Sequence, residues 1–235
     1  MLLHTSSTID VYLEIGKKRV FAGAIDWPGW ARSGPDEASA LQALCDYGQH
    51  YERALTPARL DFWAPVDVSA FVVVERLEGN ATTDFGAPDA ISTNDLRPVE
   101  EVELRRFQAL LEAYWQIFDS AVRAANGKEL RTGPRGGGRS LEGIVEHVLE
   151  AEAAYLERLG WKLKQVEAHD TAAKATRVRQ ATLEGLAASA HGEIPARGPR
   201  GGLRWVARRF VRRAGWHVLD HAWEIEERSQ DHERT

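Results

Sequence analysis

The spacing of apolar residues changes along the chain. In residues 9–15 apolar and polar side chains alternate, and a second apolar run at 20–25 follows Gly16, so these segments predict a β-hairpin with one buried face. A helix-start signal at Ser33 precedes apolar residues at helical spacing, and the β-branched run at 71–77 predicts a third strand. The first third of the chain is therefore expected to form a small ββαβ layer.

Four segments in the second half carry apolar residues every three or four positions. We expect them to be helices, with Ser140 capping the second and Asp170 or Thr171 capping the third, over about 98–125, 141–159, 171–190 and 203–228. Four amphipathic helices in sequence pack most economically as a bundle. The chain is thus predicted to be α+β, with a ββαβ domain at 1–78, a linker or covering loop at 79–98 and an antiparallel four-helix bundle at 99–235.

Composition narrows the class of protein without identifying its reaction. Of the 235 residues 43% are hydrophobic and 28% charged, but no apolar run approaches the roughly 20 residues that a membrane span needs. The single cysteine, Cys45, excludes an internal disulfide and an all-cysteine metal site, and the first residues lack the pattern of a secretory signal. The cytoplasm is therefore the expected location.

Charge is distributed unevenly along the chain. Residues 1–98 contain 8 Lys and Arg against 14 Asp and Glu, and the whole chain has a net charge of −5. Such a balance gives no general attraction for nucleic acid or anionic lipid, so neither is an expected partner. Positive charge is concentrated between Arg197 and Arg213, where seven arginines occur without an acidic residue.

Two histidines share the inward stripe of the last predicted helix. His217 and His221 continue the three- and four-residue steps of Phe210, Ala214 and Ile225, so they lie one turn apart on the same face. Two imidazoles at this spacing, with about 5–6 Å between Cβ atoms, suit a divalent cation. The same spacing occurs where core histidines are satisfied by hydroxyl or carbonyl groups, so the pair alone leaves both interpretations open.

His147 adds a third imidazole from a different helix. It lies beside Ile144 and Ala151, at the edge of the apolar face of the second predicted helix. Three uncompensated imidazoles in one core would be costly, whereas a divalent cation would satisfy one nitrogen of each. We therefore expect His147, His217 and His221 to form a metal site.

The expected helix boundaries constrain how these residues meet. They place His147 about 10 Å into its helix and His217 about 21 Å from Leu203. If the two helices run parallel, the fourth overhangs the second by roughly 10 Å. The string Gly-Pro-Arg-Gly-Gly precedes both, at 133–137 and 198–202. Two arginine-bearing loops would then flank the same end of the bundle, although both strings are equally typical of plain connectors.

Two segments resemble the paired motifs of the DinB-like, or YfiT-like, metal-binding four-helix bundles. They are GIVEHVLEAE at 143–152 and WHVLDHAWE at 216–224. The resemblance implies that His147, His217 and His221 bind a divalent metal, zinc before nickel, and leave positions open to water or substrate. Some members of this family are transferases or isomerases that use a low-molecular-weight thiol.

A second resemblance concerns the N-terminal third. Its segments AIDWPGW at 24–30 and SGPDEA at 33–38 are similar to those of HicB-like antitoxin domains. That resemblance implies a binding or accessory module rather than a catalytic one.

Charged residues suggest how a substrate would be held. Guanidinium groups near an open metal would bind a carboxylate or another anion, and Arg135, Arg204 and Arg208 are the candidates. The alternative is that the arginines pair with the acidic first third. Glu224, one turn after the last histidine, is the candidate catalytic group, either as a general base or as a group that orients an imidazole. An ordinary salt bridge is its alternative role.

Three functions remain compatible with these patterns. The first is a cytoplasmic enzyme that binds zinc or nickel and a low-molecular-weight thiol and acts on a small, anionic molecule, with a homodimer as a candidate assembly. The second is a hydrolase in which the metal activates water. The third is a non-catalytic protein in which the HicB-like layer binds a partner and the metal stabilises the helices.

Overall fold

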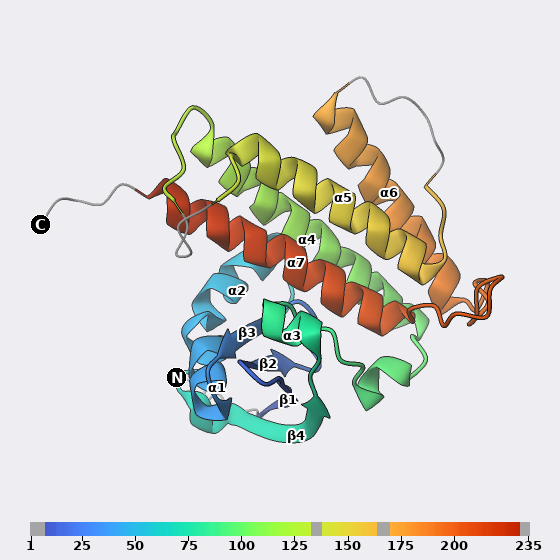
Figure 1. Ribbon diagram of the computed structural model, residues 1–235, viewed down its shortest axis with the longest axis horizontal. Coiled ribbons are helices and arrows are strands. Elements are labelled where there is room, and N and C mark those ends of the chain that lie inside the picture. The colour runs from blue at the N-terminus through green and yellow to red at the C-terminus, as the bar shows by residue number, and fades with distance from the viewer. Residues whose placement is uncertain (1–7, 133–137, 164–169, 231–235) are drawn as a thin grey trace, which may run out of the picture.

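The computed structural model describes residues 8–132, 138–163 and 170–230 and shows an α+β chain (Figure 1). A mixed four-stranded sheet comes from the first third of the chain, and the long helices of the second half pack together above it. Within the described ranges, no helix combines the length and the apolar character that crossing a membrane requires.

The sheet is built around the hairpin that the alternating pattern predicts. β1 (Ile9–Ile15) pairs antiparallel with β2 (Val20–Ala24), which confirms the hairpin. The expectation of one buried face is wrong, because all five residues of β2 are buried and Tyr12 and Glu14 of β1 are buried as well. β4 (Phe71–Glu78) lies parallel to β1 on its other side, and β3 (Ala31–Gly34) pairs antiparallel with β2. The strand order is therefore β3-β2-β1-β4, with β1 in the interior and buried along most of its length.

β3 is an additional strand that the sequence pattern does not predict. Its four residues include Arg32 and Ser33 and lack apolar alternation, so they carry no strand signal. The chain reverses at Gly29, whose φ of 100° favours glycine, and the Ala24 N–H donates to the Trp30 carbonyl at 3.0 Å. Ser33, the expected helix start, therefore lies in a strand.

Two helices replace the single helix expected after Ser33. α1 (Glu37–Asp46) is capped by Asp36, whose side chain accepts from the Ser39 N–H at 2.8 Å, and α2 (Gly48–Leu55) follows after a break. The break brings Gly48 close to the chain that returns toward the sheet, since a Cβ there would lie 3.1 Å from Pro65 Cδ. The layer is βββααβ rather than ββαβ.

Residues 79–98 form an ordered cover rather than an open linker. They contain α3 (Ala81–Phe85) and a 3-10 turn at Thr93–Leu96. Asp95, 2% exposed, accepts from Arg212 of the last helix at 2.5 Å. Arg212 also donates to the Tyr12 hydroxyl in β1 at 3.0 Å, so this segment ties the sheet to the helices.

The second half contains the four long helices that the periodicity predicts, α4 (Glu101–Ala125), α5 (Leu141–Leu159), α6 (Thr171–Ala190) and α7 (Ala207–Ser229). Ser140 caps α5 and Asp170 caps α6, as expected. α7 begins later than predicted, because Leu203 forms an isolated β-bridge with Arg197 instead of a helical turn.

α5 and α7 run antiparallel, as contacts at both of their ends show. The Trp205 N–H, just before α7, donates to the Arg158 carbonyl near the end of α5 at 2.8 Å. At the opposite end Arg228 Nη2 donates to the carbonyl of Arg139, just before α5, at 2.9 Å. The parallel arrangement with its overhang is therefore wrong for this pair.

Because α5 and α7 run antiparallel, the chain segments that precede them lie at opposite ends of the pair, and this bears on the two Gly-Pro-Arg-Gly-Gly strings. Segment 198–202 precedes α7, at the Arg158 end, whereas Gly138 lies against Arg228 at the other end of α7. Segment 133–137 itself lies outside the described residues. The flanking chain therefore gives no support to a pair of loops at one end.

α4 and α7 run in the same direction, so the four helices are not antiparallel throughout. Glu103 pairs with Arg208 near the start of both helices. Farther along, Gly215 lies against Tyr114, and a Cβ at Gly215 would sit 2.7 Å from Tyr114 Cε2. A residue without a side chain lets the two helix backbones approach closely here.

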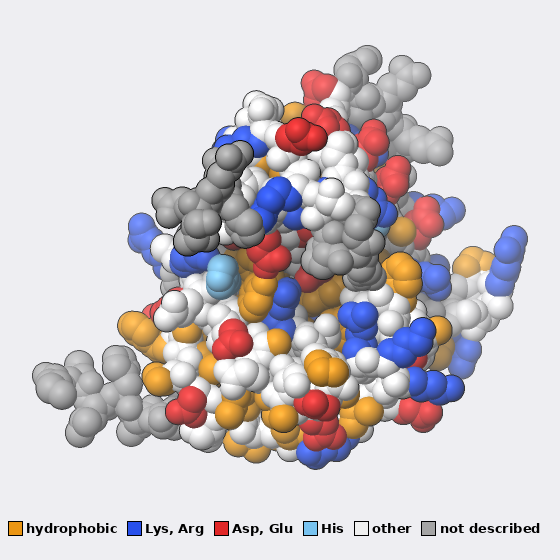
Figure 2. Space-filling model, turned by 60° about the vertical axis from the view of Figure 1, so that its left-hand side comes forward, with side chains coloured by type: hydrophobic (Ala, Val, Ile, Leu, Met, Phe, Trp, Pro, Cys, Tyr) orange, Lys and Arg blue, Asp and Glu red, His pale blue; other side chains and the backbone are white. Residues whose placement is uncertain are grey.

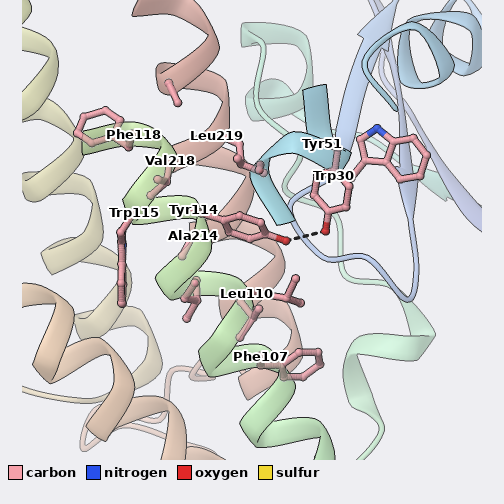
Figure 3. Close-up of a cluster of buried hydrophobic side chains, with 14 of the residues drawn as sticks. Trp30, Tyr51, Phe107, Leu110, Tyr114, Trp115, Phe118, Ala214, Val218 and Leu219 are labelled. Carbon is pink, nitrogen blue, oxygen red and sulfur yellow. Dashed lines mark hydrogen bonds between the residues drawn. The ribbon is translucent and has the colours of Figure 1, made fainter. Parts of the chain in front are cut away.

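The sheet and the helices share one apolar core, whose helical side is drawn in Figure 3. Tyr114 of α4 donates to the Pro28 carbonyl at 2.5 Å, and its hydroxyl also hydrogen-bonds to that of Tyr51 at 2.6 Å. Trp30 stacks on Tyr51 with ring centroids 5.4 Å apart. The tyrosine pair therefore joins the two halves of the chain inside the core.

Tyr114→Phe should destabilise the protein by about 1–3 kcal/mol, because the buried Pro28 carbonyl and Tyr51 hydroxyl lose their short hydrogen bonds and keep only the long one between them, at 3.5 Å. Tyr47→Phe is the matched control, since the Tyr47 hydroxyl binds Glu227 at an exposed site. Urea unfolding followed by circular dichroism measures both. Equal losses of unfolding free energy in the two variants would contradict the role given to the buried pair.

Candidate metal centre

The three histidines singled out in the sequence meet between α5 and α7. His147 comes from α5, and His217 and His221 come from α7; one ligand atom from each lies within 4.8 Å of the others. His147 Nε2 and His217 Nε2 are 3.2 Å apart. The antiparallel arrangement places His147 opposite the turn that joins the other two. The prediction that they come together is therefore confirmed.

The three rings lie edge-on to one another, and His217 is the most buried of them. Their centroids are separated by 5.0 Å for His147 and His217, 5.0 Å for His147 and His221, and 4.6 Å for His217 and His221. His217 is 6% exposed. A group of imidazoles in this arrangement offers nitrogen atoms to one shared point.

Burial keeps the inner histidine neutral. It lowers the pKa of His217 well below its usual value, and the positive charges of His221 and Arg213 act in the same direction. Burial, followed by His221 and Arg139, also lowers the pKa of His147. Neutral imidazoles carry the lone pairs that a metal requires, so the surroundings favour ligation over protonation.

Glu224 acts on His221 directly. Its Oε2 accepts from His221 Nδ1 at 2.7 Å, and its Oε1 accepts from Arg228 Nη1 at 2.7 Å. These hydrogen bonds, that of His221 first, hold the pKa of Glu224 below its usual value. With Nδ1 as the donor, Nε2 of His221 keeps its lone pair. Glu224 is therefore placed to orient a ligand, with both oxygens engaged, rather than to act as a free base.

Arg228 secures this arrangement from the end of α7. Besides pairing with Glu224, it donates through Nε to the Arg131 carbonyl at 2.7 Å and through Nη2 to the Arg139 carbonyl at 2.9 Å. The glutamate is thus fixed to the same contacts that hold α5 against α7. An outer group that fixes the tautomer of a ligand is typical of metal sites.

The donor set fits a divalent metal of the zinc or nickel type. All three ligands are imidazoles, which suit both metals, and they come from two rigid helices. The Nδ1 of His217 is buried and has no hydrogen-bond partner among the described residues. A buried polar nitrogen without a partner is costly, so this ring has one nitrogen that coordination to a metal would satisfy.

The candidate anion-binding arginines are not brought to the histidines. Arg208 forms an ion pair with Glu103 and donates to the Arg97 carbonyl at 3.0 Å and the Pro98 carbonyl at 2.8 Å. It precedes His217 by nine residues, or about 13 Å along α7. Its guanidinium is used to hold the starts of α4 and α7 together, so the expected role is not supported.

Arg204 and Arg135 are the other two candidate anion-binding arginines. Arg204 lies before α7, packs over Gly160 at the end of α5 and donates to the Pro195 carbonyl at 3.2 Å. Gly160 is about 20 Å along α5 from His147. Arg135 lies outside the described residues.

Two residues beside the histidines were not selected from the sequence. The Tyr155 ring meets His217 edge-on, with centroids 5.7 Å apart. The Arg213 guanidinium carbon lies 5.2 Å from the Tyr155 centroid and 4.8 Å from that of Trp216. Arg213 precedes His217 by one helical turn, and that spacing is the signal that points to it.

Comparison of the chain with known protein families, characterised proteins and solved structures finds no match.

The purified protein should bind about one zinc ion per chain, and His217→Ala should weaken binding by more than the roughly 10–100-fold that loss of an outer hydrogen bond costs. His191→Ala is the matched control, because His191 is exposed and contacts Glu101. Elemental analysis after dialysis and competition with a chromogenic chelator measure the effect. Similar zinc retention by the two variants would show that the three histidines are not a metal site.

Glu224→Gln should weaken zinc binding by roughly 10–100-fold while leaving one zinc ion per chain at saturation, because it removes the charge that orients His221. Glu226→Gln removes the same charge from the opposite side of α7 and should leave zinc affinity unchanged. The same chelator competition compares the variants. If both changes act alike, the hydrogen bond from His221 to Glu224 has no specific role in binding.

Proposed function

We propose that this protein is a metal-dependent enzyme of the DinB-like type, a transferase or isomerase that uses a low-molecular-weight thiol. The observation that carries the proposal is the convergence of His147, His217 and His221, whose ligand atoms lie within 4.8 Å of one another. Three protein ligands with an open position characterise catalytic zinc sites, whereas structural sites are closed by four.

The proposal places α4, α5, α6 and α7 in the four-helix bundle of that type. Its support is the direction of the helices: α4 and α7 run together, and α5 runs against them. The ligands then come from two neighbouring antiparallel members. Facing side chains on adjacent helices are the usual source of metal sites in helical bundles.

The N-terminal layer serves as an accessory module in this proposal. Arg32 of β3 donates to Asp220 at 2.9 Å, and Asp220 is adjacent to His221 in α7. The Arg32 guanidinium also lies over the Tyr47 ring, 3.7 Å from its centroid. The sheet therefore braces the helix that carries two of the three ligands.

A bound zinc or nickel ion would supply Lewis acidity and would favour the thiolate form of a thiol at the site. His147, His217 and His221 would hold the ion, and Glu224 keeps Nε2 of His221 free to bind it. The burial of His217 limits the access of water, which strengthens every electrostatic interaction inside the site. The hydrogen bonds of Arg228 keep Glu224 in place during turnover.

The metal-loaded protein should accelerate the consumption of a low-molecular-weight thiol by a model electrophile. We would test mycothiol, bacillithiol and glutathione with 1-chloro-2,4-dinitrobenzene and follow the thioether product by absorbance. His221→Ala should lower the rate to that of the protein-free reaction, since it removes a ligand, and His191→Ala should not. Zinc content is measured in each sample.

Three results would replace this function with another. Ester cleavage without thiol, lost in His221→Ala, would identify a hydrolase. No turnover of either kind by zinc-replete protein, with a lower melting temperature after chelation, would identify a metal that only stabilises the helices. No zinc in the wild type would remove the metal-dependent proposal altogether.

A further inference from the structure

The arginines of α7 differ in whether an acidic side chain pairs with them. Four of them have an acidic partner, whereas Arg213 forms no ion pair with any described residue. The pairs are Arg208 with Glu103, Arg209 with Asp89, Arg212 with Asp95 and Arg228 with Glu224. A partly buried guanidinium is normally paired, so Arg213 requires an explanation of its own.

Arg213 contacts two aromatic rings, and one of its nitrogen donors has no partner among the described residues. Its guanidinium carbon is 4.8 Å from the Trp216 centroid and 5.2 Å from the Tyr155 centroid. Its Nη1 is buried and has no hydrogen-bond partner among the described residues. Cation–π contacts occupy the faces of a guanidinium and leave the N–H donors at its edge unused. The rings position Arg213 without satisfying it.

A second unused donor lies next to Arg213. The Tyr155 hydroxyl makes no hydrogen bond to another described residue, although the side chain is largely buried. Burial raises the pKa of Tyr155, and the positive charge of Arg213 opposes that shift, so the two groups lie within electrostatic reach. A neutral phenol beside a guanidinium offers two kinds of donor to one acceptor.

This pair of donors adjoins the histidines. Tyr155 meets His217 edge-on with ring centroids 5.7 Å apart, and Arg213 precedes His217 by one helical turn of α7. Arg139 and Arg213 contribute positive charge at the histidines, Glu150 contributes negative charge at His147, and the nearby Glu224 is already paired with Arg228. A divalent ion would add two further positive charges. The excess of positive charge favours an anionic ligand.

We propose that the metal centre acts on a substrate that carries a carboxylate, and that Arg213, together with the Tyr155 hydroxyl, binds this carboxylate. The inference rests on the proposed metal-dependent function and adds the substrate class and the residue that recognises it. A guanidinium binds a planar carboxylate through two N–H groups, which gives it both charge and geometry for this role. Arg213 therefore takes the anion-binding role that the sequence suggests for Arg204 and Arg208.

The test compares benzoate with benzamide, which have the same shape but differ in charge. Saturation-transfer NMR titrations on zinc-loaded wild type should give a dissociation constant at least about tenfold lower for benzoate. Arg213→Met should weaken benzoate binding about tenfold or more and leave benzamide unchanged. Arg158→Met is the matched control, since it removes the same charge at an exposed position near the end of α5 and should bind benzoate as the wild type does.

Arg213→Lys covers the case in which Arg213→Met does not fold. It keeps the charge but loses the planar fork, so benzoate binding should fall to an intermediate value. Circular dichroism and zinc content are measured for every variant. Equal affinity of wild type for benzoate and benzamide would overturn the inference, as would benzoate affinity unaffected by the folded Arg213 variants.

The zinc measurement separates this inference from the function on which it rests. Normal zinc binding with no role for Arg213 would leave the metal centre intact and reject only the carboxylate site. Absence of zinc from wild type would reject the metal-dependent function, and the benzoate titration on the metal-free chain would then decide the anion site by itself.

Discussion

The antiparallel pairing of α5 and α7 is the constraint on which the candidate centre depends. Hydrogen bonds at the two ends of the pair, from Trp205 to Arg158 and from Arg228 to Arg139, fix how far one helix lies along the other. If α5 were displaced along α7 by one helical turn, about 5.4 Å, His147 would no longer meet His217 and His221. The ligand atoms of the three residues now lie within 4.8 Å of one another, which is less than this displacement. The convergence of the three histidines is therefore a consequence of helix register.

The sheet and the covering segment hold α7 from its other sides. Gly215 admits Tyr114 against the α7 backbone, and Tyr114 is itself bonded to Pro28 of the sheet layer. Asp95 of the covering segment binds Arg212 at a site where both side chains are almost fully buried. Rotation of α7 about its axis would break these contacts together. The N-terminal third thus contributes rigidity to the histidines, although no histidine of the trio comes from it.

Local sequence signals were sufficient to predict the long helices and the three histidines. They were not sufficient to predict which distant residues these elements and the arginines would contact. Ser140 and Asp170 are residues that cap helices, and the periodicity behind them is long, so α5 and α6 could be predicted closely. β3 and the late start of α7 could not be predicted, because both depend on β-pairing with another segment of the chain. The same reason explains Arg208: its spacing in the sequence suits an anion site, but whether Glu103 will neutralise it is decided only by the tertiary fold.

The pairing of the arginine cluster decides the charge near the histidines. Two of the pairs, Arg209 with Asp89 and Arg212 with Asp95, join α7 to the covering segment, which agrees with the alternative in which the cluster meets the acidic first third. Those guanidinium groups then contribute little field beyond their own carboxylates. Arg213 has no such partner in the part of the chain that the structure describes, and it precedes His217 by one helical turn. Among the arginines of α7, Arg213 is therefore the one that contributes positive charge at the histidines without a paired carboxylate among the described residues, and the proposed carboxylate site rests on this feature.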